Sequence, residues 1–216
     1  MRTLYDAIYP ANIPSNAEMV ACYVDGNWPN YPDACDRFPN AVHVSIATQG
    51  ADAQVLDVEA GNTQPDQAPA WITRQRARGQ IPTVYCNVAT WPAVVAACKV
   101  QGVAPPIWWA ADWDRDPTIT DGAIAKQHTN DVAPGYDISS VADHWPGVDP
   151  EPTEEDLTPE QAKQLADTAW LVKNALGPAI NAIRAAVHVL GSDADEIIAA
   201  LKTLPDDVRQ NIKNNL

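Results

Sequence analysis

The sequence predicts an α/β fold, an irregular and shortened (β/α) barrel followed by an α-helical C-terminal segment. Short apolar runs alternate with helical stretches up to residue 148, which is typical of parallel strands joined by helices. An acidic, proline-rich stretch follows, and after it the apolar residues recur at helical spacing. We therefore expect a barrel domain over 1–148, a linker over 149–158 and a helical segment over 159–216.

The individual elements of the first part follow from apolar runs and stop signals. Thr90 is a candidate N-cap, and Gly79 and Gly102 are typical C-terminal stops of helices. A doubly wound sheet and a TIM-like barrel both fit the alternation, but the GxGxxG and GxxxxGK[ST] loops of nucleotide-binding sheets are absent from the sequence. The predicted helices are Pro69–Gly79 and Trp91–Gly102, and the predicted strands are Val20–Val24, Val42–Ala47, Gln54–Val58, Thr83–Cys86, Ile107–Ala111 and Ala123–Gln127, with Tyr136–Ser139 as a candidate for one more.

The composition argues against several classes of protein. A net charge of −14 disfavours nucleic-acid binding, which needs Lys and Arg against phosphates. The sequence has no run of eighteen apolar residues that would predict a membrane span, and its first residues lack the apolar core of a signal peptide. The four cysteines form no CxxC pair, so we expect neither a metal site nor a cofactor. Buried thiols are the default expectation, and a Cys22–Cys35 bridge stays open.

The predicted helical segment begins at a capping-box sequence, Thr158-Pro159-Glu160-Gln161. From Ile180 to Val208 the apolar residues keep a spacing of three and four, which is the heptad pattern. Gly191 and Pro205 argue against one unbroken helix. Two readings remain open: a helical hairpin, or a coiled coil that assembles several chains.

Acidic residues stand at the ends of several predicted strands. Asp57 and Glu59 are two residues apart, so their side chains point to the same side of a strand. At the carboxyl end of a barrel strand, that side is the mouth where active sites form. Cleavage of a glycosidic bond needs such a set of carboxyl groups, one to protonate the leaving oxygen and another to attack, activate water or stabilise the cationic transition state. Further acids follow other predicted strands: Asp25, Asp112, Asp114 and Asp137.

A series of motifs over residues 20–140 resembles the family 25 glycoside hydrolases, the lysozyme-type muramidases of bacteria and phages, and especially their short actinobacterial and actinophage relatives. The matching segments occur in the order of the family. They are Asp25, Leu56-Asp57-Val58-Glu59, Val84-Tyr85-Cys86-Asn87, Ile107-Trp108-Trp109-Ala110-Ala111-Asp112, Lys126-Gln127-His128-Thr129 and Tyr136-Asp137-Ile138-Ser139.

The resemblance implies a site. Glu59 would be the general acid, Asp57 the acid paired with it, and Asp25 and Asp137 the flanking acids. Aromatic rings stack on sugar faces, and the expected substrate-binding residues are Tyr85, Trp109, Asp112, Gln127 and Trp28. The implied substrate is bacterial cell-wall glycan.

The chain also departs from the family. Few residues separate Asp25 from Leu56, and because a βαβ unit needs ~30 residues, we expect at least one unit to be missing and the barrel to be incomplete. Two functions therefore stay open. One is a phage-encoded or phage-derived peptidoglycan hydrolase, made in the host cytoplasm and acting at the cell wall. The other is a catalytically degenerate barrel that serves as a glycan-binding or structural module of a phage virion or tail, joined as a homo-oligomer or to virion proteins through residues 159–216.

Overall fold

The computed structural model describes residues 1–150, 158, 160, 163–164, 166–168 and 204–205. The chain divides into two units, Met1–Glu151 and Pro152–Leu216. In the second unit the described positions 160, 163–164 and 166–168 are helical. The heptad stripe, and with it the choice between a helical hairpin and a coiled coil, lies outside the described residues.

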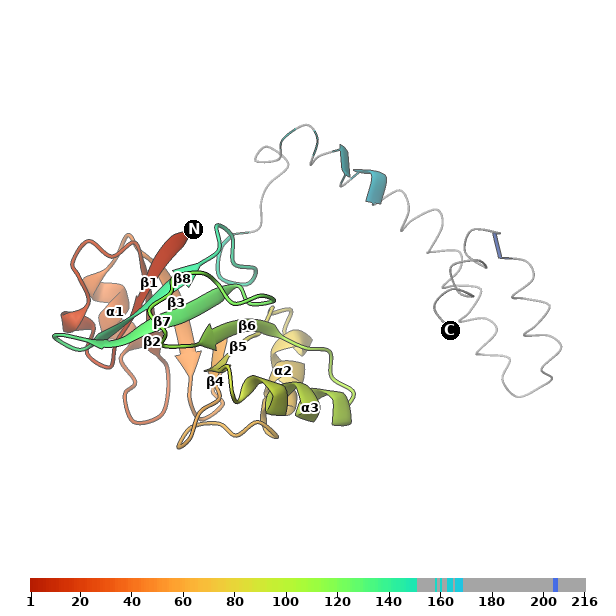
Figure 1. The fold of residues 1–216 in the computed structure, drawn as a ribbon, viewed down its shortest axis with the longest axis horizontal. Helices are drawn as coiled ribbons and strands as arrows, with labels where there is room; N and C mark the ends of the chain where they lie inside the picture. Colours follow the sequence, from red (N-terminus) through yellow and green to blue (C-terminus); the bar gives the residue numbers. More distant parts are fainter. Residues whose placement is uncertain (151–157, 159, 161–162, 165, 169–203, 206–216) are drawn as a thin grey trace. The chain divides into compact units, whose positions relative to one another are not determined.

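The first unit is a closed barrel of eight strands, in which each strand pairs with the next along the chain and β8 pairs with β1 (Figure 1). Strands β1 to β7 run parallel, whereas β8 is antiparallel to both of its neighbours. The strands are β1 (Arg2–Asp6), β2 (Met19–Tyr23), β3 (Val42–Ala47), β4 (Val55–Asp57), β5 (Thr83–Asn87), β6 (Ile107–Ala111), β7 (Ala125–Val132) and β8 (Tyr136–Val141).

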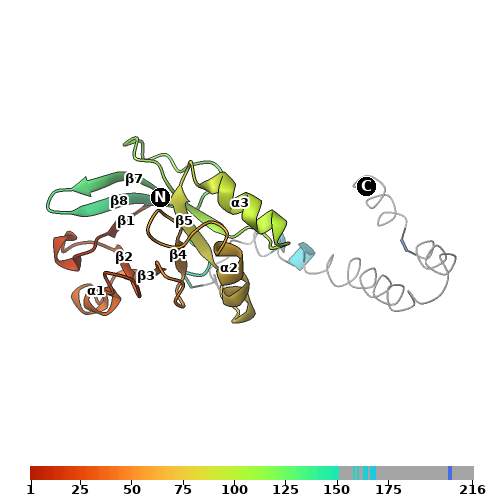
Figure 2. The same ribbon diagram turned by 90° about the horizontal axis from the view of Figure 1, so that it is seen from below.

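Helices cover only part of this barrel. Helix α1 (Tyr31–Arg37) follows β2, α2 (Ala68–Ala77) follows β4 and α3 (Trp91–Val100) follows β5, while the β1–β2 connection holds the short 3-10 helix η1 (Pro10–Asn12). Figures 1 and 2 show α2 and α3 side by side against one side of the barrel and α1 apart from them. The described β3–β4 and β6–β7 connections hold no helix.

The barrel fold is therefore confirmed, but the expected loss of a strand unit is wrong. Eight strands close the ring, and what is reduced is the set of helices outside it. The prediction overlooked β1 and therefore took the second strand for the first. Strand β1 is five residues long and lies at the N-terminus, where a short alternating run gives little periodic signal.

Most predicted elements recur with shifted ends. The run Ile107–Ala111 matches β6, whereas β7 begins two residues later than predicted and extends to Val132. Gly79 and Gly102 follow α2 and α3 with φ of +76° and +65°, as glycine stops require. Thr90 precedes α3, but its side chain makes no capping hydrogen bond.

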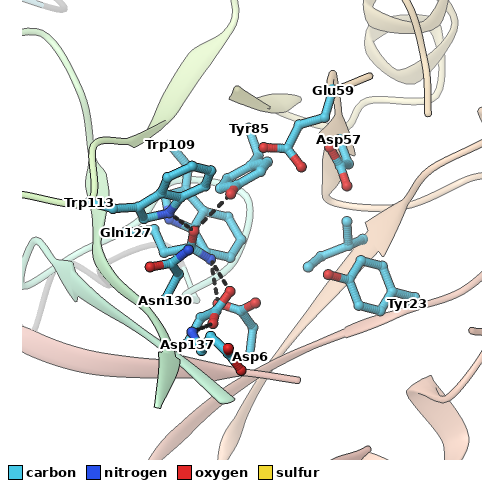
Figure 3. Close-up of a pocket in the computed structure, with 12 residues that line it drawn as sticks. Asp6, Tyr23, Asp57, Glu59, Tyr85, Trp109, Trp113, Gln127, Asn130 and Asp137 are labelled. Carbon is cyan, nitrogen blue, oxygen red and sulfur yellow. Dashed lines mark hydrogen bonds between the residues drawn. The ribbon is translucent and has the colours of Figure 1, made fainter. Parts of the chain in front are cut away.

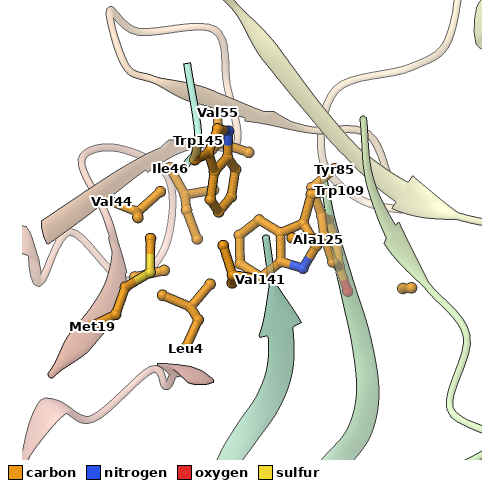
Figure 4. Close-up of a cluster of buried hydrophobic side chains, with 12 residues drawn as sticks. Leu4, Met19, Val44, Ile46, Val55, Tyr85, Trp109, Ala125, Val141 and Trp145 are labelled. Atoms are coloured by element: carbon orange, nitrogen blue, oxygen red, sulfur yellow. The ribbon is translucent and has the colours of Figure 1, made fainter. Parts of the chain in front are cut away.

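The interior of the barrel is filled by alternate residues of the strands, as Figure 4 shows. Trp145, which follows β8, is fully buried in this cluster. Its ring meets Trp109 edge to face at 5.8 Å, and its Nε1 donates to Thr83 Oγ1 at 2.9 Å. The cluster consists of Leu4, Met19, Ala21, Val44, Ile46, Val55, Tyr85, Trp109, Ala111, Ala125, Val141 and Trp145.

The chain that carries Trp145 is bonded to the start of β1. The guanidinium of Arg2 donates to both carboxylate oxygens of Asp149, at 2.8 and 2.6 Å. One of these oxygens also accepts the backbone N–H of Trp145 at 2.6 Å. Contacts of the barrel therefore extend through Asp149, the first residue of the expected linker.

All four cysteines are free thiols. Cys22, Cys86 and Cys98 are buried, in line with the default expectation, and Cys35 is partly exposed without a bridge to Cys22.

Candidate active site

The strand register gathers acids at one rim of the barrel. Strands β1 and β4 end in Asp6 and Asp57. Strand β8 runs in the opposite direction, so its first residues lie at this same rim, and Asp137 is the direct partner of Asp6. Successive strand residues alternate between faces, so the face that contributes Leu4 and Val55 to the core contributes Asp6 and Asp57 at the rim.

These acids line a polar cavity of about 190 Å³. Figure 3 shows Glu59 near Asp57 on one side of it and Asp6 beside Asp137 on another. None of the lining side chains is basic, so the cavity disfavours anionic ligands. The lining residues are Asp6, Tyr23, Ile46, Asp57, Glu59, Tyr85, Trp109, Trp113, Gln127, Asn130, Asp131 and Asp137.

Gln127 links the two sides of this cavity. Its Nε2 donates to Asp6 Oδ2 at 3.0 Å and to Asp137 Oδ2 at 3.2 Å. Its Oε1 accepts the Tyr85 hydroxyl at 2.8 Å and the Trp113 Nε1–H at 2.7 Å (Figure 3). Because both ends of this buried amide are engaged, Gln127 orders the acids and rings around it.

Burial and mutual repulsion raise the pKa values of these carboxyl groups. Burial raises the pKa of Asp6 to about 8, and the charge of Asp137 adds to the shift while the Gln127 bond opposes it. Burial likewise raises the pKa of Asp57 to about 8, with the charge of Glu59 as the next cause. Burial also raises the pKa of Asp137. The backbone N–H of Asp131, which donates to Asp137 Oδ1 at 2.6 Å, opposes this shift.

Asp57 and Glu59 differ in their surroundings. Asp57 is 4% exposed; its Oδ2 accepts Asn62 Nδ2 at 2.8 Å, and its buried Oδ1 has no partner among the described residues. Glu59 is partly exposed, and burial raises its pKa, while the Tyr85 hydroxyl opposes the shift and the charge of Asp137 adds to it. The site thus holds two neighbouring carboxyl groups with raised pKa values, and such groups can donate a proton in general acid catalysis.

A second hollow of about 200 Å³ adjoins the cavity and shares Tyr23, Asp57 and Glu59 with it. Trp28 lines this hollow with its ring 47% exposed. Tyr9, 53% exposed, meets Trp28 edge to face at 6.0 Å. The two hollows, here together called the groove, thus share Asp57 and Glu59, and each is also lined by an exposed tryptophan, Trp113 in the first and Trp28 in the second.

Asp25, expected as a flanking acid, does not line the acid cavity but lines the second hollow together with Asp57 and Glu59. The Asp25 carboxylate accepts backbone N–H groups of Thr48 at 2.5 Å and Ala51 at 2.9 Å. Partial burial raises its pKa, but these backbone bonds outweigh that effect and lower it. Gly26 has a φ of +78°, and a Cβ there would overlap the Thr48 hydroxyl. Asp25 therefore holds a loop at the edge of the second hollow.

The other predicted residues take different places. Tyr85, Gln127, Asp57, Glu59 and Asp137 line the cavity as expected. Trp109 also lines the cavity, but only 1% of this residue is exposed, and its Nε1 donates to Ser139 Oγ at 3.0 Å. Trp109 therefore closes the base of the cavity and leaves no ring face open for stacking on a sugar. Asp112 lies outside the lining, with its Oδ2 3.9 Å from Lys126 Nζ.

The structure adds cavity residues that the sequence analysis missed. Asp6 follows a strand as the predicted acids do, so the same rule would have found it once β1 was recognised. Trp113 had a signal of its own, as a large ring directly after a strand. Asn130 and Asp131 lie on β7, but the predicted strand ended at Gln127. The missed lining residues are Asp6, Tyr23, Ile46, Trp113, Asn130 and Asp131.

No group of three or more His, Cys, Asp or Glu side chains could hold a metal ion in the part of the chain that the structure describes. Within that same part, no helix has the length and apolar character needed to cross a membrane.

Comparisons with known proteins give one structural likeness. No protein-family model matches the chain, and no curated protein sequence matches it. A solved structure of a muramidase from Acremonium alcalophilum aligns over 67% of this chain and 95% of that chain, at 12% sequence identity and a TM-score of 0.46.

Proposed function

We propose that this chain is a glycoside hydrolase of the muramidase type, which cleaves a β-1,4 bond in bacterial cell-wall glycan. The observation that carries the proposal is the cluster of carboxyl groups, among them Asp6, Asp57, Glu59 and Asp137, around one polar cavity at the carboxyl rim of a closed barrel. Active sites of (β/α) barrels lie at this rim. The motif resemblance of the sequence points to the same chemistry.

Glu59 is proposed as the general acid that protonates the glycosidic oxygen. Its raised pKa keeps a proton available above the range of an ordinary glutamic acid. Asp57 is proposed as the carboxylate that stabilises the cationic transition state. Burial and the charge of Glu59 raise its pKa to about 8 against the Asn62 bond, so Asp57 can stabilise that charge only in its ionised form.

Asp6 and Asp137 are proposed as the flanking acids, with Asp6 in the role that the sequence analysis gave to Asp25. Their shared bond to Gln127 fixes both carboxyl groups. The charge of Asp137 disfavours ionisation of Glu59 and so helps it to keep its proton.

The groove suits a neutral, hydroxyl-rich chain. Carboxyl, amide and hydroxyl groups line it, and the exposed rings of Trp28 and Trp113 offer flat surfaces for sugar faces. Hollows on both sides of Asp57 and Glu59 support binding of sugar units on either side of the bond that is cut. We infer that the protein acts at the cell wall, while a place on a phage particle and assembly through residues 159–216 remain predictions.

The test is hydrolysis of purified actinobacterial cell walls by wild type and Glu59→Gln, followed by turbidity and by release of reducing ends. We expect Glu59→Gln to lose at least ~100-fold in rate while still binding walls in a pull-down. Glu18→Gln, at an exposed glutamate before β2, is the matched control and should hydrolyse walls like wild type. A folded wild type that releases no reducing ends would overturn the proposal.

A further inference from the structure

Lys126 is a buried lysine that the proposed chemistry does not use. It precedes Gln127 on β7 and therefore points away from the cavity, to the outer face of the strand. Only 5% of its side chain is exposed, and a buried ammonium is costly unless it is paired. Its Nζ lies 2.9 and 2.8 Å from the two carboxylate oxygens of Asp114 and 3.9 Å from Asp112 Oδ2.

The residue between these two aspartates is Trp113, on the β6–β7 loop. Its ring lines the cavity and is 46% exposed. Two backbone bonds tie the loop to β7, from Asp112 N–H to the Gln127 carbonyl at 3.0 Å and from Arg115 N–H to the His128 carbonyl at 2.9 Å. Residues on both faces of β7 thus hold this segment. Gln127 accepts the Trp113 indole N–H at 2.7 Å, and on the other face Lys126 pairs with Asp114 and lies 3.9 Å from Asp112.

We propose that Lys126 and Asp114 form a clamp that holds Trp113 at the cavity rim as a preformed stacking surface for a sugar ring. The clamp makes Lys126 a positioning residue that acts through Trp113 and touches no substrate itself. Its role in substrate binding rests on the proposed function, whereas its effect on Trp113 does not.

The physical reason for such a clamp is the exposure of Trp113. A half-exposed ring on a loop without a helix has one hydrogen bond of its own, and that bond fixes only the edge of the indole. Substrate binding would have to order the rest of the loop, at a cost in affinity. The charge-assisted bonds of Asp114 to a buried lysine fix the residue directly after the ring before substrate arrives.

Two variants break the clamp from opposite ends. Lys126→Met keeps the length and apolar stem of the buried side chain and leaves the carboxylates at the surface. Asp114→Asn removes the negative charge from a residue that is 42% exposed, so it tests the clamp with no change in the core. Lys99→Met, at an exposed lysine on α3, is the matched control.

The first measurement needs no substrate. In ¹⁵N NMR spectra, the Trp113 indole N–H signal is assigned by its absence in Trp113→Phe, and its exchange with water is followed in each variant. We expect exchange to rise about tenfold or more in Lys126→Met and Asp114→Asn, because opening of the loop becomes easier, and to be unchanged in Lys99→Met. An unchanged Trp113 signal in both clamp variants would overturn the proposal.

The second measurement is steady-state hydrolysis of solubilised cell-wall glycan. A preformed stacking surface predicts a KM about tenfold higher in both clamp variants and a kcat within about twofold of wild type. Equal KM values, with the indole signal changed, would refute the role in substrate binding. If wild type itself releases no reducing ends, the proposed function fails, and the indole signal still decides whether the clamp exists.

Discussion

Asp57 should make the barrel less stable at neutral pH than it is in weak acid. Its pKa is raised from 3.8 to about 8 by burial and by the charge of Glu59. A group whose pKa is raised by folding stabilises the folded state at low pH, and this contribution is lost as pH rises through the folded pKa. The free energy of unfolding should therefore fall between about pH 4 and pH 8.

The substitution Asp57→Asn removes the titrating group and keeps its shape. The asparagine carbonyl can still accept the Asn62 N–H, and its amide replaces the oxygen that has no partner. A shift of about four pKa units sets an upper limit of ~5–6 kcal/mol at ~1.4 kcal/mol per unit. Because Asp6, whose pKa is also raised to about 8, takes up a proton in the same range, we expect about half of this, so Asp57→Asn should be ~2–3 kcal/mol more stable than wild type at pH 8 and nearly equal to it at pH 4.

Urea unfolding between pH 4 and pH 8, followed by tryptophan fluorescence, measures this difference. Seven of the eight tryptophans precede the linker, so the signal reports on the barrel. The control is Asp66→Asn, at an exposed aspartate before α2, which should keep the pH dependence of wild type. The reasoning is refuted if wild type and Asp57→Asn lose stability in parallel as pH rises, or if the variant is less stable at pH 8. The same variant should lose wall hydrolysis, since function is what retains a destabilising buried acid.

Two further predictions follow from the charges of the barrel. Wall hydrolysis should decline at alkaline pH as Glu59 loses its proton, and Asp137→Asn should move this decline to lower pH, because the charge of Asp137 helps to raise the pKa of Glu59. A pH–rate profile that is identical in both proteins would contradict this. Asp149→Ala should cost ~2 kcal/mol in urea unfolding at pH 7, because it leaves the part-buried Arg2 guanidinium unpaired. Asp143→Ala, at a carboxylate 87% exposed, should unfold like wild type, and equal effects would argue against a role for the Arg2–Asp149 pair.

The sequence predicted the strands that are bounded by residues typical of turns. Ile107–Ala111 is an apolar run bounded by Pro106 and Asp112, and the structure has β6 at these residues. The glycine stops of α2 and α3 were also local signals, because glycine adopts positive φ without steric cost. Strand β1 was not predicted, and Asp6 was therefore not recognised as a site residue. Five residues at the N-terminus form too short a pattern to distinguish a strand from a loop.

The sequence also placed Asp57 and Glu59 on one side of a strand, because alternation along a strand is a local rule. Only the tertiary structure decided which acids join them. Asp6 and Asp137 are 131 positions apart in the sequence and become partners because closure of the barrel pairs β1 with β8. Asp25 looked equivalent to them in sequence, yet its carboxylate accepts the backbone N–H groups of residues 48, 49 and 51. Which acids line the cavity depends on long-range strand pairing and on competing hydrogen bonds, and neither can be predicted from the local sequence.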